Sequence, residues 1–190
     1  MKKTLGFLGV GLAMVGSTAA MAQTPYYAND YGLYLGVSAG QIMYYEQGLP
    51  EMNPTVALFR VGQQFSPYLA LEGRIGTSVS GGSTYAYGQG YRVNAQAIYA
   101  AYVKGMLPIN PWFSGYALAG LGGAQWHRDY PTYNSNDVNL SFGVGGEFHL
   151  GGNASLDVEW ARLTSGTNNA DGYNYGYSAN QLTFGVNWRL

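Results

Sequence analysis

Two histidines and their neighbours are the residues of this sequence that could supply acid–base chemistry. His127 is followed by Asp129 and Ser135, and His149 lies two residues after Glu147. A serine nucleophile needs a general base within hydrogen-bond reach, and neither histidine lies in a recognisable nucleophile motif. The cluster around His127 is therefore interpreted as a solvated loop, and no enzyme is expected.

Other chemistries find little support. The chain has no cysteine, which excludes a disulfide framework and a Cys-ligated metal. The glycine-rich segments alternate with strand residues instead of opening a helix, so no phosphate loop is predicted. A net charge of −1 gives no reason to expect a nucleic-acid partner. We expect no cofactor and no metal.

The charged residues of the predicted strands share one face, opposite the large apolar side chains. They are Arg60, Glu72, Arg74, Lys104, Glu147, Asp157, Glu159 and Arg189, and Arg92 is expected beside them. Buried charges are costly unless they pair. We predict that they form a polar network inside a narrow barrel, as a structural plug. The alternative is a small, gated path for ions or water.

Period-two alternation indicates the elements that must hold these charges. In the segment 138–150, apolar Leu140 and Phe142 alternate with polar Asn139 and Ser141. Similar patterns predict strands over residues 31–40, 56–65, 69–76, 92–104, 113–126, 138–150, 154–161 and 182–190. The segment 92–104 is expected to place Val93 and Ala95 with the apolar face, whereas the faces of 113–126 remain open.

The connections alternate in length. Short ones fall at residues 66–67, 108–111 and 151–153, and long ones rich in Tyr, Gly, Asn and Ser fall at 43–54, 80–91, 127–136 and 165–177. Short turns at one end and exposed loops at the other are typical of an outer-membrane barrel. We predict an all-β fold, an eight-stranded antiparallel up-and-down transmembrane β-barrel.

Charge and aromatic placement favour a membrane barrel over a soluble sandwich. Charged residues are 10% of the chain, against about 25% in soluble domains, and almost none falls on the apolar face. Aromatic residues near both strand ends are interpreted as interfacial girdles. They are Tyr31, Phe65, Tyr68, Trp112, Phe113, Phe148 and Trp188 near the short turns, and Trp126 and Trp160 near the long loops.

The first 22 residues read as a cleaved signal peptide. Lys2 and Lys3 precede about a dozen apolar residues, and Ala20-Met21-Ala22 forms the expected cleavage site. The barrel domain is then expected to comprise residues 23–190.

Several motifs resemble the transmembrane domain of outer membrane protein A and its eight-stranded relatives. They are residues 63–72 and 121–126, Lys104 ahead of Pro108, residues 145–148, and residues 184–190. The resemblance implies location in the outer membrane, periplasmic chaperones and insertion by the barrel-assembly machinery. That machinery would read Phe184, Val186, Trp188 and Leu190 in the last strand, where Leu190 stands in place of the usual Phe. The sequence ends at the barrel, so no cell-wall anchor is expected.

The expected function is a structural or surface-interaction role in the cell envelope. The long loops carry Tyr85, Tyr87, Tyr91, Tyr130, Tyr133, Tyr173, Tyr175 and Tyr177, a composition suited to a host or surface ligand or to contact with lipid and lipopolysaccharide. A narrow porin-like channel and a lipid-modifying enzyme are the alternatives.

Overall fold

The computed structural model describes residues 31–129, 133–170 and 173–190, which form nine strands. The predicted signal peptide, residues 1–22, lies outside the described residues. The strands are β1 Leu33–Glu46, β2 Thr55–Ser66, β3 Leu69–Ser80, β4 Gly82–Ala86, β5 Gln89–Asn110, β6 Phe113–Arg128, β7 Tyr133–His149, β8 Ala154–Ala170 and β9 Tyr173–Arg189. Within these described ranges, no helix is long and apolar enough to cross a membrane.

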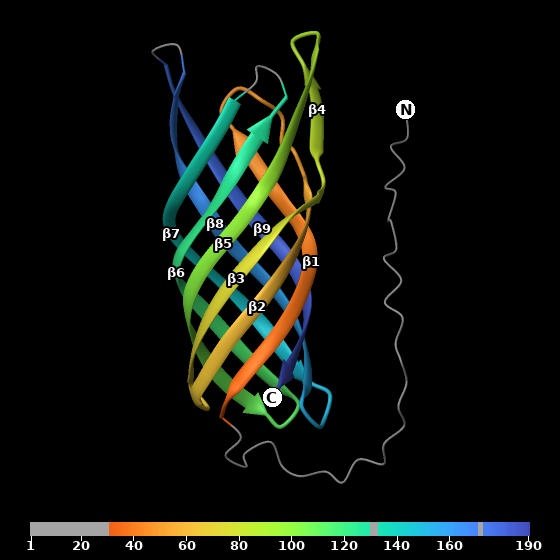
Figure 1. Cartoon of the computed structure of the whole chain (residues 1–190), viewed down its shortest axis with the longest axis vertical. Coiled ribbons are helices and arrows are strands. Elements are labelled where there is room, and N and C mark those ends of the chain that lie inside the picture. Colours follow the sequence, from red (N-terminus) through yellow and green to blue (C-terminus); the bar gives the residue numbers. More distant parts are fainter. Residues whose placement is uncertain (1–30, 130–132, 171–172) are drawn as a thin grey trace.

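Eight of these strands close into a ring (Figure 1). Strands adjacent in sequence pair antiparallel, except β3 and β4, and β1 pairs with β9 through Val37 and Val186. The second closing contact joins β3 to β5, with Leu71 opposite Val103. The short β4 pairs with β5 beyond that contact, so it adds to a hairpin and not to the ring. The predicted eight-stranded up-and-down barrel is confirmed.

The predicted long loops are largely strands, which corrects that part of the prediction. β8 and β9 stay paired out to Ala170 and Tyr173, and β4 and β5 form a hairpin that projects beyond the ring (Figure 1). Tyr and Thr accept extended backbone well. Tyr87 and Gly88 both have positive φ, 50° and 77°, which suits a tight hairpin turn. We call this side the hairpin end, and the opposite side the short-turn end.

Alternation along the strands places large apolar side chains on the outer surface, and toward the short-turn end it places small or polar side chains inside. On β7, Leu140 is 77% exposed on the outer surface, whereas Ser141 is buried. On β9, exposed Phe184 follows buried Thr183 in the same way. An apolar outer wall of this extent suits hydrocarbon rather than water.

A bulge in β5 overturns the predicted faces at its start. Ala95 lies opposite Trp126 and Ala97 opposite Gln125, so Gln96 is an extra residue in the ladder. One extra residue moves every earlier side chain to the other face. Val93 and Ala95 are therefore buried inside, and Arg92 is exposed outside instead of in the lumen.

The faces of β6, which the sequence leaves open, follow one unbroken alternation. Ser114, Tyr116, Leu118, Ala124 and Trp126 are buried inside the barrel. Trp126 is only 3% exposed, so its assignment to the outer aromatic girdle is wrong. Trp126 is an even number of residues from the inward-facing Ser114, and β6 has no bulge between them. The side chain of Trp126 therefore also faces the lumen.

Candidate functional site

The short-turn half of the lumen holds a set of ion pairs contributed by five strands. Arg60 of β2 contacts Asp157 of β8 at 2.7 Å. Arg74 of β3 contacts both Glu72 and Glu159 at 2.5 Å. Lys104 of β5 contacts Glu147 of β7 at 2.9 Å. The structure thus brings together seven of the eight residues assigned to the lumen network.

Neutral side chains complete the hydrogen bonds of these carboxylates. The Tyr34 hydroxyl donates to Glu72 at 2.5 Å, and the Tyr116 hydroxyl donates to Glu159 at 3.0 Å. Ser155 donates to Glu147 at 2.7 Å. The sequence analysis did not assign the two tyrosines to the network, because it interpreted tyrosine as an interfacial or loop residue. The available signal was position, since Tyr34 alternates with the outward Leu33 and Leu35.

The network also uses aromatic faces. The Lys104 ammonium lies 4.1 Å from the Tyr116 ring centroid, and the Arg74 guanidinium lies 4.8 Å from that of Tyr102. Cations placed over aromatic rings are attracted by the ring quadrupole. Because the charged side chains are almost completely buried, the network is favourable only when every member keeps its partners.

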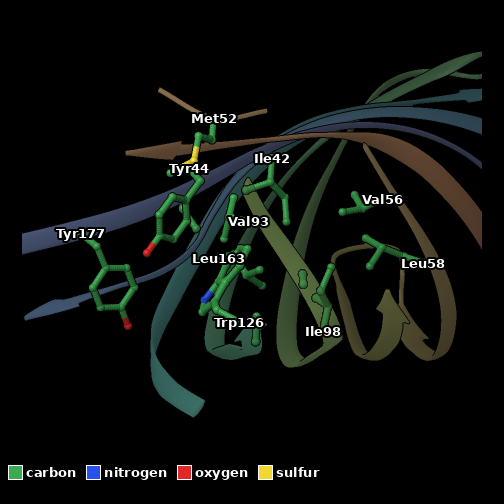
Figure 2. Packing of buried hydrophobic residues seen from close by; sticks show 13 residues of the cluster. Ile42, Tyr44, Met52, Val56, Leu58, Val93, Ile98, Trp126, Leu163 and Tyr177 are labelled. Carbon is green, nitrogen blue, oxygen red and sulfur yellow. The ribbon is translucent and has the colours of Figure 1, made fainter. Parts of the chain in front are cut away.

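The hairpin half of the lumen is filled with apolar side chains, which the sequence analysis did not predict (Figure 2). Met52 is fully buried, and the rings of Tyr44 and Trp126 lie 4.9 Å apart. The cluster comprises Ile42, Tyr44, Met52, Val56, Leu58, Val93, Ala95, Ile98, Ala124, Trp126, Leu163, Tyr177 and Ala179. We call it the apolar layer. Val56 and Leu58 share the inward face of Arg60, which was the signal available in the sequence.

A further ion pair lies farther along the same strands, at the mouth. Arg128 of β6 contacts Glu46 of β1 at 2.7 Å, and the Tyr44 hydroxyl donates to Glu46 at 3.3 Å. From the short-turn end to the hairpin end, the lumen is therefore closed first by the ion pairs, then by the apolar layer, and then by the Arg128–Glu46 pair.

Arg189, the eighth assigned lumen residue, is half-buried at the short-turn end. It lines a small cavity together with Gln64, Lys104, Glu147 and Asn187. This cavity has room for about one water molecule. It is too small to hold a substrate.

The two histidines lie at opposite ends of the barrel. Ser114 Oγ lies 3.0 Å from His149 Nε2, but His149 Nδ1 is 4.0 Å from Glu147, too far for the hydrogen bond that would orient the ring. Glu147 is already engaged by Lys104 and Ser155. His127 lies 3.3 Å from Asp129 at the hairpin end, partly exposed. Among the described residues, no group of His, Asp and Glu could hold a metal ion.

The remaining assigned aromatics lie on the outer surface. Tyr31, Phe65, Tyr68, Trp112, Phe148, Trp160 and Trp188 are exposed, and Phe113, half-buried, packs on Phe148 with centroids 4.8 Å apart. Phe184 and Trp188 of β9 and Leu190 just after it are exposed outward, and the half-buried Val186 lies on the same outer face.

The sequence matches the model of the outer membrane protein beta-barrel domain family over residues 10–189. The chain belongs to this family. Membership of this family implies a location in the outer membrane. No protein with a curated description matches the sequence.

Solved structures share the fold of this family member at low identity. Neisserial surface protein A is 13% identical, covers 84% of this chain and 97% of its own, and has a TM-score of 0.60. OprG of Pseudomonas aeruginosa is 8% identical, with coverages of 85% and 98% and a TM-score of 0.55. Ail, the attachment invasion locus protein of Yersinia pestis, is 15% identical, with coverages of 83% and 99% and a TM-score of 0.52. These similarities extend to the fold alone.

Replacing Arg60 with Met should destabilise the barrel by about 3–5 kcal/mol, because it leaves Asp157 buried without its cation. The double variant Arg60→Met, Asp157→Leu should recover most of that loss. Urea unfolding of the protein in lipid vesicles, followed by tryptophan fluorescence, measures both. The exposed Arg92→Met is the control and should change stability by less than about 0.5 kcal/mol. Equal stability of the single and double Arg60 variants would contradict the pairing argument.

Proposed function

We propose that this protein is a non-conducting structural barrel of the outer membrane whose projecting hairpins present an interaction surface to the outside. The observation that supports it best is the closure of the lumen at successive levels, by the ion network and then by the apolar layer. An eight-stranded barrel has an interior that side chains can fill. A narrow channel would need both levels to move together.

The surface role is supported by exposed aromatics on the β4–β5 hairpin. Tyr85 and Tyr87 are 72% and 81% exposed, and the Tyr87 hydroxyl donates to the carbonyl of Gly48 in the neighbouring connection. Rigid aromatic side chains on a supported hairpin lose little entropy on binding. We propose that a host or surface ligand contacts these tyrosines, and that the protein is not an enzyme.

We also propose export by a signal peptide comprising residues 1–22, followed by periplasmic chaperones and the barrel-assembly machinery. The outward alternation of Phe184, Val186, Trp188 and Leu190 supports the last step. N-terminal sequencing of the protein from an outer-membrane fraction should begin at Gln23. A first residue within 1–22 would contradict cleavage at this site.

Planar-bilayer recording should show at most small and rare conductance for the wild-type protein. Trp126→Ala, which thins the apolar layer, should behave in the same way because the ion network still closes the lumen. A large, stable, continuously open pore in the wild type would overturn the structural proposal and favour a porin-like channel.

Replacing Tyr85 and Tyr87 with Ser should reduce attachment of producing cells to a host-cell monolayer at least several-fold. Tyr68→Ser changes another exposed tyrosine, which lies at the short-turn end; it is the control and should leave attachment unchanged. Detergent sensitivity of the cells separates the two roles, since the hairpin variant should keep normal envelope integrity. Unchanged attachment by the hairpin variant would remove the tyrosines from the proposal.

A further inference from the structure

The short strand β4 has a free edge. It pairs with β5 from Gly82 opposite Val93 to Ala86 opposite Gln89, and it is the last strand in the order of the sheet. Within the described part of the chain, no strand pairs with its second edge. A Cβ on Gly82 would touch residues 53–54 of the β1–β2 connection, so this edge is covered only at its base. The rest of β4 projects beyond the ring (Figure 1).

The hairpin turn determines which backbone groups face the free edge. The turn has two residues, so Ala86 and Gln89, which close it, form a hydrogen-bonded pair. Hydrogen-bonded and non-hydrogen-bonded positions alternate along an antiparallel ladder. Ser83 and Tyr85 therefore direct their N–H and C=O groups away from β5, toward the free edge.

This edge lacks the residues that normally protect an edge strand. Residues 80–91 contain no Asp, Glu, Lys, Arg or Pro. Exposed edges usually carry charges or proline, because these prevent pairing with a second chain. Ser83 and Tyr85 are both exposed, so their backbone is accessible from outside. An uncharged, extended edge fits another uncharged strand and not an ionic ligand.

We propose that β4 pairs with β4 of a second copy of this chain, carried by a facing outer membrane. An antiparallel arrangement centred on Thr84 places Ser83 of each copy opposite Tyr85 of the other. Both residues direct their backbone groups across the contact, so each opposite pair exchanges two N–H···O bonds. All the free groups of Ser83 and Tyr85 are then paired. The edge is its own complement, which commits the site to a second copy.

The direction of β4 selects copies in facing membranes. β4 points away from the ring, roughly along the long axis of the barrel (Figure 1), and long connections lie on the outer side of such barrels. Two copies in one membrane point the same way, so a two-fold pair would bring the Ser83 N–H of one against the same N–H of the other. Copies in facing membranes are inverted, as antiparallel pairing requires. The inference rests on the outer-membrane location and exposed hairpin of the proposed function, but not on a host ligand.

The contact is small and acts through the number of copies. β4 has five residues, and one such pairing buries far less than the roughly 1,200 Å² of a stable protein–protein interface. Many copies on two touching cells bind together, which multiplies the affinity of a single weak contact. We therefore expect adhesion between producing cells, whereas the purified protein stays monomeric in detergent.

The test uses a single introduced thiol, since the chain has no cysteine. Thr84→Cys lies at the two-fold centre, in a non-hydrogen-bonded pair with Cα atoms about 4.5 Å apart, within reach of a disulfide. Two cell populations without O-polysaccharide produce this variant with different peptide tags, and are mixed under mild oxidation. Crosslinked dimers should carry both tags. Ser83→Cys is the matched control, because its two copies lie about 9 Å apart, and it should crosslink at least about tenfold less.

A second pair of variants tests the contact without a cysteine. Ser83→Pro removes an edge N–H that the hairpin does not use, whereas Ser83→Ala keeps the backbone. Ser83→Pro should reduce clustering of producing cells several-fold, and Ser83→Ala should cluster like the wild type. Heat-modifiable gel migration should show that each variant is folded.

Three results would overturn the proposal. They are crosslinks that form only between copies on one cell, equal crosslinking by Thr84→Cys and Ser83→Cys, and equal clustering by the wild type and Ser83→Pro. Attachment of the same cells to a host-cell monolayer is measured in parallel. If clustering is absent while attachment still depends on Tyr85 and Tyr87, this inference fails and the proposed function stands.

Discussion

The structure depends on one constraint, that backbone N–H and C=O groups facing hydrocarbon must be paired within the wall. A sheet with free edges cannot meet this requirement in a membrane, whereas a closed ring can. The β1–β9 and β3–β5 pairings remove both edges. The strand ladders run through most of the apolar part of the wall. The described β7–β8 ladder ends at Phe142 and Arg162, on the way to the hairpin end.

Closure creates a second requirement, because the strands must place every other side chain in a narrow interior. Near the short turns, polar positions fill that space with Arg60, Arg74 and Lys104 and their carboxylate partners. Near the hairpins, the inward-facing positions of the strands carry Val, Ile, Leu and Trp instead. The lumen therefore changes from an ion network to an apolar cluster along one set of strands. An interior filled in this way is more consistent with a structural role than with a water-filled channel.

Much of the network was accessible from the sequence, but its pairing was not. Alternation alone put Glu72, Glu147 and Asp157 on the inward face. It could not show that Arg60 meets Asp157 across the barrel, since these residues are 97 positions apart and their contact depends on ring closure. The hydroxyls of Tyr34 and Tyr116 were missed for a related reason. Tyrosine suits an interface, a loop or a lumen, and composition does not distinguish these environments.

The sequence by itself determined the fold class, the number of strands in the ring and the largely apolar outer face, because period-two alternation and turn residues are local properties. The tertiary structure alone decided which side chains share the lumen at each level. The extra residue at Gln96 reverses the faces of Arg92 and Val93, and the unbroken alternation of β6 carries Trp126 inside. A bulge has no unique sequence signature, since its position is chosen by the packing of neighbouring strands. For that reason a one-residue shift in register cannot be predicted from the sequence and is seen only in the closed ring.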